Sequence, residues 1–400
     1  MTFMSLLRGL FGLFSWLILA LAGYLLWSGY ERADEDEPDV RAGLIEDGDE
    51  WRMYVGWGLL FLSLFGRFIW PLILAKGDGK GDPPITRGEA RKVAGADGSE
   101  LNVEQFGRKD GPAIVFTHGW GLDSTIWRYA RKDLGERFRI LVWDLPGLGR
   151  SSQPKDGRYT LERLGDDLRA VADSAGGPVV LVGHSIGGMT SQTLAGLRPE
   201  VLGEKVKGIV LVNTTHLRPS RTTAASSLVE AIYPIAKVFL SLQIPLAPLA
   251  WLTKWQSYLS GQAHIANRIG GFGKHVTRGQ LEHTTRLATK ANPAVEAKGI
   301  FAMQAWDITP QLPKVSVPVL VLGGQVDLIT KEEAGETIAR TIPGARFKLM
   351  PGCGHMGFYE YAEAYNREIG AFADEVLGGA SAAAAPAAAN VGTSQISPAR

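Results

Sequence analysis

Short apolar runs alternate with longer amphipathic stretches through the middle of this chain, from Ala90 onward. The runs have the length and composition of buried strands, and most are followed by a turn and a stretch with helical spacing. This alternation predicts a mainly parallel sheet with helices on both faces. The first two runs flank Asp97-Gly98, a hairpin signal, and therefore predict an antiparallel edge. The expected strands are 91–94, 101–106, 113–117, 139–143, 179–182, 207–212, 319–322 and 347–349.

One interval, Leu217 to Pro313, lacks a strand pattern and predicts a helical insertion. Its prolines favour several short helices over one long helix. It holds ten Lys/Arg and four Asp/Glu, a net charge of +6, yet Ile232 to Leu252 contains one charge in twenty-one residues. Three prolines in that apolar run argue against a single membrane-spanning helix, because proline interrupts helices. The run could roof an active site, or it could lie against an anionic membrane surface, and the two are compatible.

Two apolar runs precede the alternating region. Gly9 to Tyr30 contains twenty-two residues without a charge, enough to cross a hydrocarbon core of ~30 Å as a helix. Met53 to Ala75 is similar but contains Arg67 and Pro71. Because Arg67 lies toward one end, its side chain could reach the membrane surface. The pattern predicts a membrane anchor over 1–76 with transmembrane helices at about 9–30 and 53–75, followed by a linker over 77–89.

Charge sets the expected orientation of this hairpin. Glu31 to Arg52 carries ten acids and three bases, a net of −7. Basic residues flank the other ends of the two runs, at Arg8, Lys76, Lys80, Arg87, Arg91 and Lys92. Since Lys and Arg stay on the cytoplasmic side, we expect a multi-pass membrane protein whose remaining chain is cytoplasmic. A cleaved signal peptide is the alternative, but its Ala20-Leu21-Ala22 pattern lies inside the apolar run.

Overall composition excludes some classes of protein. The formal net charge of +1 gives no reason to expect a nucleic-acid partner. The single cysteine, Cys353, excludes an intrachain disulfide and is expected to be a small buried thiol. Small residues and prolines over 378–400 predict a disordered tail.

Gly183-His184-Ser185-Ile186-Gly187 follows one predicted strand and precedes a predicted helix. It fits G-x-S-x-G, the nucleophile elbow, whose glycines allow a very tight turn. A serine on such a turn is held in the open, where it can attack a substrate.

Three further motifs follow predicted strands. "FTHGWG" places Trp120 where its backbone N–H, with that of Ile186, could form an oxyanion hole. "VLVLGGQVDLIT" places Asp327 just beyond a strand, and "MPGCGHMGFYE" places His355 in a glycine-bounded loop. Ser185, Asp327 and His355 thus occur in the order nucleophile, acid, base. We predict that they form a catalytic triad.

Together with "DLPGLGRSS" and "AWDITPQLPKVSVPVLVLGG", these motifs show that the region from about Ala90 to Leu377 resembles the α/β-hydrolase fold superfamily, in its serine-hydrolase branch. The resemblance implies an α/β fold with an eight-stranded sheet and a helical lid after the sixth strand, here 217–313. The hydrolase core would then comprise 90–216 and 314–377. It also implies Ser185, Asp327 and His355 as the triad. Relatives with aspartate at the Ser185 position, the haloalkane dehalogenases and epoxide hydrolases, are disfavoured.

Other polar residues have structural interpretations. Asp144 and Arg150 are expected to pin their loop as ion partners, and Asp307 is expected to be structural. The insertion's histidines lack metal-ligand spacing, and no phosphate-binding loop is present, so neither a metal nor a cofactor is predicted. These histidines are His264, His275 and His283.

The sequence therefore predicts a membrane-anchored serine hydrolase that cleaves carboxylic esters. The expected substrate is a small-molecule or lipid ester, in particular a lipid-like or medium-chain acyl ester. Three alternatives stay open. They are a cofactor-free haloperoxidase-like enzyme, a carbon–carbon bond hydrolase using the same triad, and a non-enzymatic membrane binding module.

Overall fold

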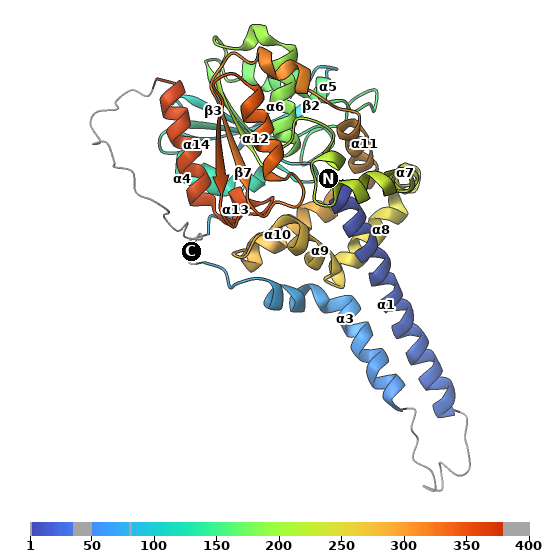
Figure 1. Ribbon diagram of the computed structural model, residues 1–400. Coiled ribbons are helices and arrows are strands. Elements are labelled where there is room, and N and C mark those ends of the chain that lie inside the picture. Colours follow the sequence, from blue (N-terminus) through green and yellow to red (C-terminus); the bar gives the residue numbers. More distant parts are fainter. Residues whose placement is uncertain (1, 35–49, 80–81, 379–400) are drawn as a thin grey trace.

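The computed structural model describes residues 2–34, 50–79 and 82–378. Its centre is an eight-stranded sheet in the order β1-β2-β4-β3-β5-β6-β7-β8 (Figure 1). The strands are β1 (Glu89–Ala94), β2 (Glu100–Gly107), β3 (Ala113–Thr117), β4 (Arg139–Trp143), β5 (Val179–His184), β6 (Val206–Val212), β7 (Val319–Gly324) and β8 (Arg346–Met350). Each of the eight expected strands is present, and the predicted fold class is confirmed.

The pairing is antiparallel for β1 with β2 and for β2 with β4, and parallel for every later pair. The antiparallel start predicted from Asp97-Gly98 is therefore confirmed at one edge. In parallel strands with both faces covered, nearly every residue is apolar, and β3 and β5 are buried along their whole length.

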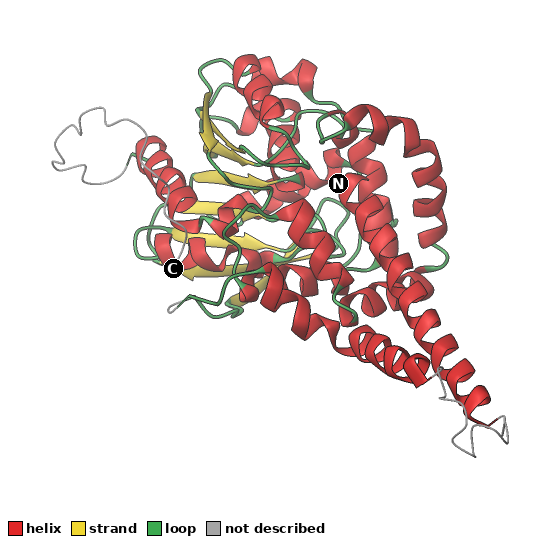
Figure 2. Cartoon of the chain, turned by 60° about the horizontal axis from the view of Figure 1, so that its bottom comes forward, coloured by secondary structure: helices red, strands yellow, loops and turns green. Residues whose placement is uncertain are grey.

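Two hydrophobic cores lie on opposite faces of the sheet, because successive strand residues point to opposite sides. Val115 and Leu181 belong to one core, and Phe116 and Val182 belong to the other. Figure 2 shows helices on both sides of the strands. The first face is covered by α5 (Leu161–Asp173), α6 (Ile186–Leu197) and α12 (Glu332–Thr341), and the second by α4 (Arg128–Leu134), α13 (Gly357–Glu360) and α14 (Ala362–Val376).

Five helices, which we call the helical insert, lie between β6 and β7. They are α7 (Ser226–Gln243), α8 (Ala247–Leu259), α9 (Gln262–Gly271), α10 (Arg278–Lys290) and α11 (Pro293–Gln304). Short 3-10 turns at Pro219–Arg221 and Thr309–Lys314 join the insert to the core. Asp307 forms an isolated antiparallel β-bridge with Leu217, and its side chain accepts a hydrogen bond from the backbone N–H of Thr309. These contacts give Asp307 a structural position where the chain returns from the insert to the core.

Two long N-terminal helices, α1 (Thr2–Asp34) and α3 (Glu50–Leu74), pack side by side and project from the insert side of the molecule (Figure 1). Each is long and apolar enough to cross a membrane. The predicted acidic segment lies mainly outside the described residues, as does the predicted disordered tail from residue 379. Pro71 lies inside α3.

The two N-terminal helices contact the insert directly. Met4 of α1 is buried against Gly270 of α9, and the indole N–H of Trp16 donates to the Thr253 hydroxyl of α8 at 3.2 Å. After α3, the backbone around Lys76 bonds to Val276 and Arg278. The hairpin and the insert therefore form one packed unit.

Candidate active site

Ser185 lies at the turn from β5 into α6, as the G-x-S-x-G pattern predicts. Its backbone has φ 55° and ψ −119°, a strained conformation for a residue with a side chain. A Cβ on Gly183 would overlap the carbonyl of Gly187, and one on Gly187 would overlap the carbonyl of Thr117. These two glycines are therefore required for β5, α6 and β3 to meet closely around the serine.

Asp327 and His355 come together from the loops after β7 and β8. The Nδ1 of His355 lies 2.9 Å from Oδ2 of Asp327, and both side chains are buried. A carboxylate at Nδ1 fixes the tautomer that leaves the other ring nitrogen, Nε2, free to accept a proton.

The surroundings of Asp327 keep it ionised. Oδ1 accepts from the backbone N–H groups of Ile329 and Thr330, while Oδ2 accepts from the Thr330 hydroxyl and, at 3.0 Å, from the Asn213 amide. Burial opposes the charge, but His355 and these donors outweigh it and lower the pKa of Asp327 below its ordinary value. Asn213 was not identified from the sequence. It follows β6 directly and has a positive φ of 45°.

The Nε2 atom of His355 is buried without a hydrogen-bond partner in the described part of the chain, and the structure shows no hydrogen bond from it to Ser185. Within the predicted triad, Asp327 and His355 are therefore hydrogen-bonded to each other, whereas Ser185 and His355 are not. The neighbouring ring of His184 holds the histidine in place, with ring centroids 4.7 Å apart, and its Nε2 lies 3.0 Å from the His355 carbonyl oxygen. Burial, then the nearby His355, lowers the pKa of His184 well below its ordinary value, so this ring stays neutral.

The two predicted oxyanion donors are Trp120, in the turn after β3, and Ile186, the elbow residue that begins α6. Among the described residues, neither the backbone N–H of Trp120 nor that of Ile186 has an acceptor. Both stay available for a substrate oxygen. The Trp120 side chain is held separately, since its indole N–H donates to the Glu296 carbonyl oxygen of α11 at 3.1 Å.

His118, which precedes this loop, has a structural position. The backbone N–H of Leu145 donates to its Nε2 at 3.0 Å, so Nδ1 carries the proton and donates to the Gly119 carbonyl oxygen at 2.8 Å. Burial lowers the pKa of His118, which is consistent with a neutral ring.

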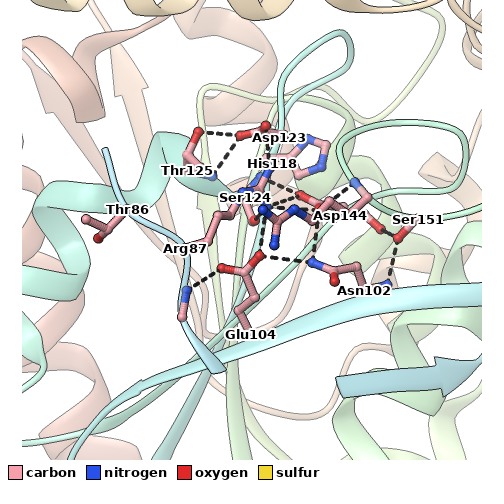
Figure 3. A network of polar contacts seen from close by, with 12 residues as sticks. Thr86, Arg87, Asn102, Glu104, His118, Asp123, Ser124, Thr125, Asp144 and Ser151 are labelled. Atoms are coloured by element: carbon pink, nitrogen blue, oxygen red, sulfur yellow. Dashed lines mark hydrogen bonds and ion pairs between the residues drawn. The ribbon is translucent and has the colours of Figure 1, made fainter. Parts of the chain in front are cut away.

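A polar network behind this loop corrects one prediction (Figure 3). The buried carboxylate of Asp144 pairs with Arg87 of the linker at 3.0 Å. Arg150 contributes only its backbone N–H, at 2.9 Å, and its side chain is exposed. The prediction of an Asp144–Arg150 ion pair is therefore wrong in its partner, because the guanidinium of a residue far back in the chain occupies the site. Nothing in the spacing of the sequence links Arg87 to Asp144.

Arg87 also pairs with Glu104 at 2.9 Å and Asp123 at 2.6 Å, and it donates to the Ser124 hydroxyl at 2.7 Å (Figure 3). Burial opposes its charge, but these three carboxylates outweigh the burial and raise the pKa of Arg87. One guanidinium thus joins the linker to the loop that follows Trp120.

The other residues singled out in the sequence have structural environments of their own. Cys353 is buried, and burial raises its pKa to about 12, so the thiol is unreactive. His264 pairs with Glu282 at 2.8 Å, and His283 contacts Tyr359. Burial lowers the pKa of His283 to about 3. Within the described ranges no group of three or more His, Cys, Asp or Glu side chains could hold a metal ion.

Comparison with known proteins identifies relatives of this arrangement. Residues 114–368 match the alpha/beta hydrolase family. The chain is 28% identical over 267 residues to a pimeloyl-[acyl-carrier protein] methyl ester esterase of Nitrosomonas europaea, a match that covers 67% of this chain and 97% of that protein. It is also 28% identical to a bifunctional esterase/perhydrolase of Acinetobacter calcoaceticus, over 70% of this chain and 98% of that protein.

Solved structures agree. A thermophilic esterase from Thermogutta terrifontis aligns with a TM-score of 0.52 at 25% identity, over 72% of this chain and 99% of that chain. An esterase from Exiguobacterium antarcticum shares the fold with a TM-score of 0.58 at 20% identity, over 72% of this chain and 100% of that chain. With the sheet order, the elbow and the matched region, these likenesses establish the relationship: the chain belongs to the alpha/beta hydrolase family, among its esterase-like members.

Proposed function

We propose that this protein is a membrane-anchored serine hydrolase that cleaves carboxylic esters through an acyl-enzyme on Ser185. The observation that carries the proposal is the buried His355–Asp327 pair: among the described residues Nε2 of His355 has no hydrogen-bond partner, and its ring contacts His184, the residue before the strained Ser185. The matched relatives include esterases, which supports ester hydrolysis as the reaction.

In the proposed reaction, Nε2 of His355 removes the Ser185 proton as Oγ attacks the ester carbonyl carbon. The carbonyl oxygen becomes an oxyanion, which accepts hydrogen bonds from the N–H groups of Trp120 and Ile186. His355 then returns the proton to the departing alkoxide, so an alcohol leaves and an acyl-enzyme remains. Water, deprotonated by His355, releases the acid and restores the serine. Asp327 stabilises the imidazolium throughout.

Membrane anchoring is the second part of the proposal. The two N-terminal helices are long and apolar enough to span a membrane, and they lie outside the region shared with the family. Basic residues flank the ends nearest the hydrolase domain, which favours a cytoplasmic position for that domain.

The substrate class is proposed from the character of the insert. Ser185 is 3% exposed, not held in the open as the elbow pattern predicted, so neighbouring groups must move before a substrate reaches it. Because α7 and α8 of the insert are largely apolar and α8 packs on the hairpin, we propose substrates that partition into lipid, such as medium-chain or lipid-like acyl esters.

A second candidate reaction is favoured by relatives named as an esterase/perhydrolase and as a non-heme haloperoxidase. Here hydrogen peroxide would replace water in attacking the same acyl-enzyme, giving a peracid. Peroxide-dependent oxidation of a halide at a rate above ester hydrolysis would favour this candidate.

The test is labelling of the full chain with a fluorophosphonate probe, followed by hydrolysis of acyl esters of increasing length. We expect wild type to be labelled and Ser185→Ala to lose labelling and activity, with rates highest for medium or long chains. Ser191→Ala is the matched control, because Ser191 is a buried serine of the same helix whose hydroxyl donates to the Gly187 carbonyl.

Unlabelled, folded wild type would contradict the serine mechanism. The lipid-like substrate class would be contradicted if short soluble esters were preferred and deletion of residues 1–76 changed nothing.

A further inference from the structure

Helices α7 and α8 expose a surface rich in large apolar side chains. Between Ala231 and Trp255, the one charged residue that is exposed is Lys237. Val238, Phe239, Leu249 and Leu252 are each more than half exposed. Soluble proteins rarely present such a surface to water, so it requires a partner. We call it the α7–α8 face, and its large apolar members are Ile235, Val238, Phe239, Leu242, Leu246, Leu249, Trp251, Leu252 and Trp255.

This face continues the exposed apolar surface of the hairpin. Helix α8 packs against both α1 and α3, and Figure 1 shows it beside α1 on the same side of the domain. On α1, Leu10, Leu13 and Leu17 are also more than half exposed. A bilayer that receives α1 therefore meets α8 next to it.

The contacts between the hairpin and the insert resemble those between membrane helices. A Cβ on Gly66 of α3 would overlap the carbonyl of Ser260, and one on Gly261 would overlap the indole of Trp70. Small residues let membrane helices approach closely, because lipid gives no hydrophobic drive to bring them together. These contacts lie inside the apolar run of α3, not beyond its end.

Arg67 of α3 is half-buried and lies between the insert and Phe68 of its own helix, whose ring centroid is 4.3 Å from the guanidinium. Its guanidinium lies 5.5 Å from the ring centroid of Tyr258, whose hydroxyl donates to Glu282. A charge at membrane depth is placed this way, turned toward protein groups that can compensate it. The arginine that weakened the second predicted span is therefore consistent with a helix that passes through lipid beside α8.

The depth of α8 follows from α1. The aromatic residues Trp27 and Tyr30 are exposed near the far end of α1, where an aromatic belt marks one membrane interface. Counting ~20 residues inward, the length that crosses the hydrocarbon core, puts the other boundary near Leu7 to Leu10. Thr253 of α8 contacts Gly12 and Trp16. Gly12 and Trp16 lie two to nine residues inside that boundary, so at ~1.5 Å per residue Thr253 of α8 lies on the order of 3–14 Å inside it.

We propose that the α7–α8 face is embedded in the acyl region of the bilayer leaflet next to the hydrolase domain, so that the insert lies in the membrane beside the hairpin. The occupant of this face is lipid. The inference rests on the membrane-anchoring part of the proposed function and not on ester hydrolysis. It deepens that proposal, because an acyl chain would meet the insert without leaving the bilayer.

The experiment places single nitroxide labels on the full chain in liposomes and compares collisions with oxygen, which enters lipid, and with a water-soluble nickel chelate. The test variants are Leu249→Cys and Leu252→Cys. Leu17→Cys is the lipid-facing control on α1, and Lys109→Cys is the aqueous control in the exposed turn after β2. Wild type serves as the labelling blank, because its one cysteine is buried.

We expect labels at 249 and 252 to favour oxygen as the label at 17 does, with at least about a tenfold lower collision rate with the nickel chelate than at 109. If the labels at 249 and 252 collided with the nickel chelate as often as the label at 109, while the label at 17 favoured oxygen, the inference would be overturned and the membrane anchor would still stand. Aqueous behaviour at 17 as well would overturn both. Since no readout uses an ester, failure of the proposed hydrolysis would be seen separately, in the probe labelling of Ser185.

Discussion

The indole N–H of Trp120 donates to the carbonyl oxygen of Glu296, so the loop with the proposed oxyanion donor is fastened to helix α11 of the insert. The Glu296 side chain is itself held by Lys254 of α8 at 2.6 Å. Movement of the insert is therefore linked to the position of one proposed oxyanion donor.

Gly299→Ala tests this link. A Cβ on Gly299 would overlap the Trp120 indole, so the ring and its loop must shift. Since loss of one oxyanion donor costs roughly 10²–10³ in kcat, we expect kcat to fall by at least about tenfold while KM changes less. Gly177→Ala is the control, because a Cβ there meets nothing within 4 Å. Equal, near-native kcat values for both variants would show that the indole does not position the loop.

Asp327→Asn tests the role of the acid. The amide would hold His355 in the wrong tautomer and remove the negative charge, so we expect kcat for ester hydrolysis to fall by about 10³–10⁴ with the fold intact. Asp307→Asn is the matched control, since Asp307 is exposed and accepts a hydrogen bond from the backbone N–H of Thr309. Substrate turnover and circular dichroism give the two readouts. A fall of less than tenfold for Asp327→Asn would argue for another acid.

Arg87→Ala tests the network behind the oxyanion loop. Without the guanidinium, the fully buried carboxylates of Glu104 and Asp144 lose their shared cation. Breaking a buried ion pair on one side costs about 3–5 kcal/mol, and we expect a loss of this size in the free energy of unfolding. Arg150→Ala should change stability by less than about 0.5 kcal/mol, because its side chain is exposed. Denaturant unfolding measures both losses. If Arg150→Ala lowered the free energy of unfolding more than Arg87→Ala, the assignment of Arg87 as the ion partner of Asp144 would be wrong.

Local patterns predicted the strands and the elbow because each is encoded by contiguous residues. Asp327 and His355 were identified because both follow strand ends at one edge of the sheet, and the structure joins them. Asn213 and Arg87 were missed because their importance depends on partners far away in the chain. Arg67 was expected to reach toward the membrane surface, and its contact with Tyr258 of α8 was not predicted, for the same reason. Periodicity shows which residues are buried, but it does not show which distant polar groups meet.

Asp167 of α5 gives a prediction about pH. Its Oδ1 accepts from the backbone N–H of Ala96 at 2.7 Å, while Oδ2 is buried without a partner among the described residues. Burial raises the pKa of Asp167 from 3.8 to about 6, despite the Ala96 hydrogen bond. The folded protein therefore holds this proton between about pH 4 and pH 6, where the unfolded chain has released it. The contribution of Asp167 to stability is greatest below pH 4 and is lost as the pH rises through 6.

Above pH 6 the folded protein must bury an ionised carboxylate at Asp167, which lowers its stability. Asp167→Asn removes this cost, because the amide keeps an acceptor for the Ala96 N–H and carries no charge. We expect the variant to be more stable than wild type at pH 7.5, by at most about 3 kcal/mol, with the difference vanishing near pH 4. Thermal unfolding at both pH values measures it. Asp173→Asn, an exposed position at the end of the same helix, should show no such dependence. If Asp167→Asn instead destabilised the protein most at pH 7.5, the ionised carboxylate would have a stabilising partner, and the burial argument would be wrong.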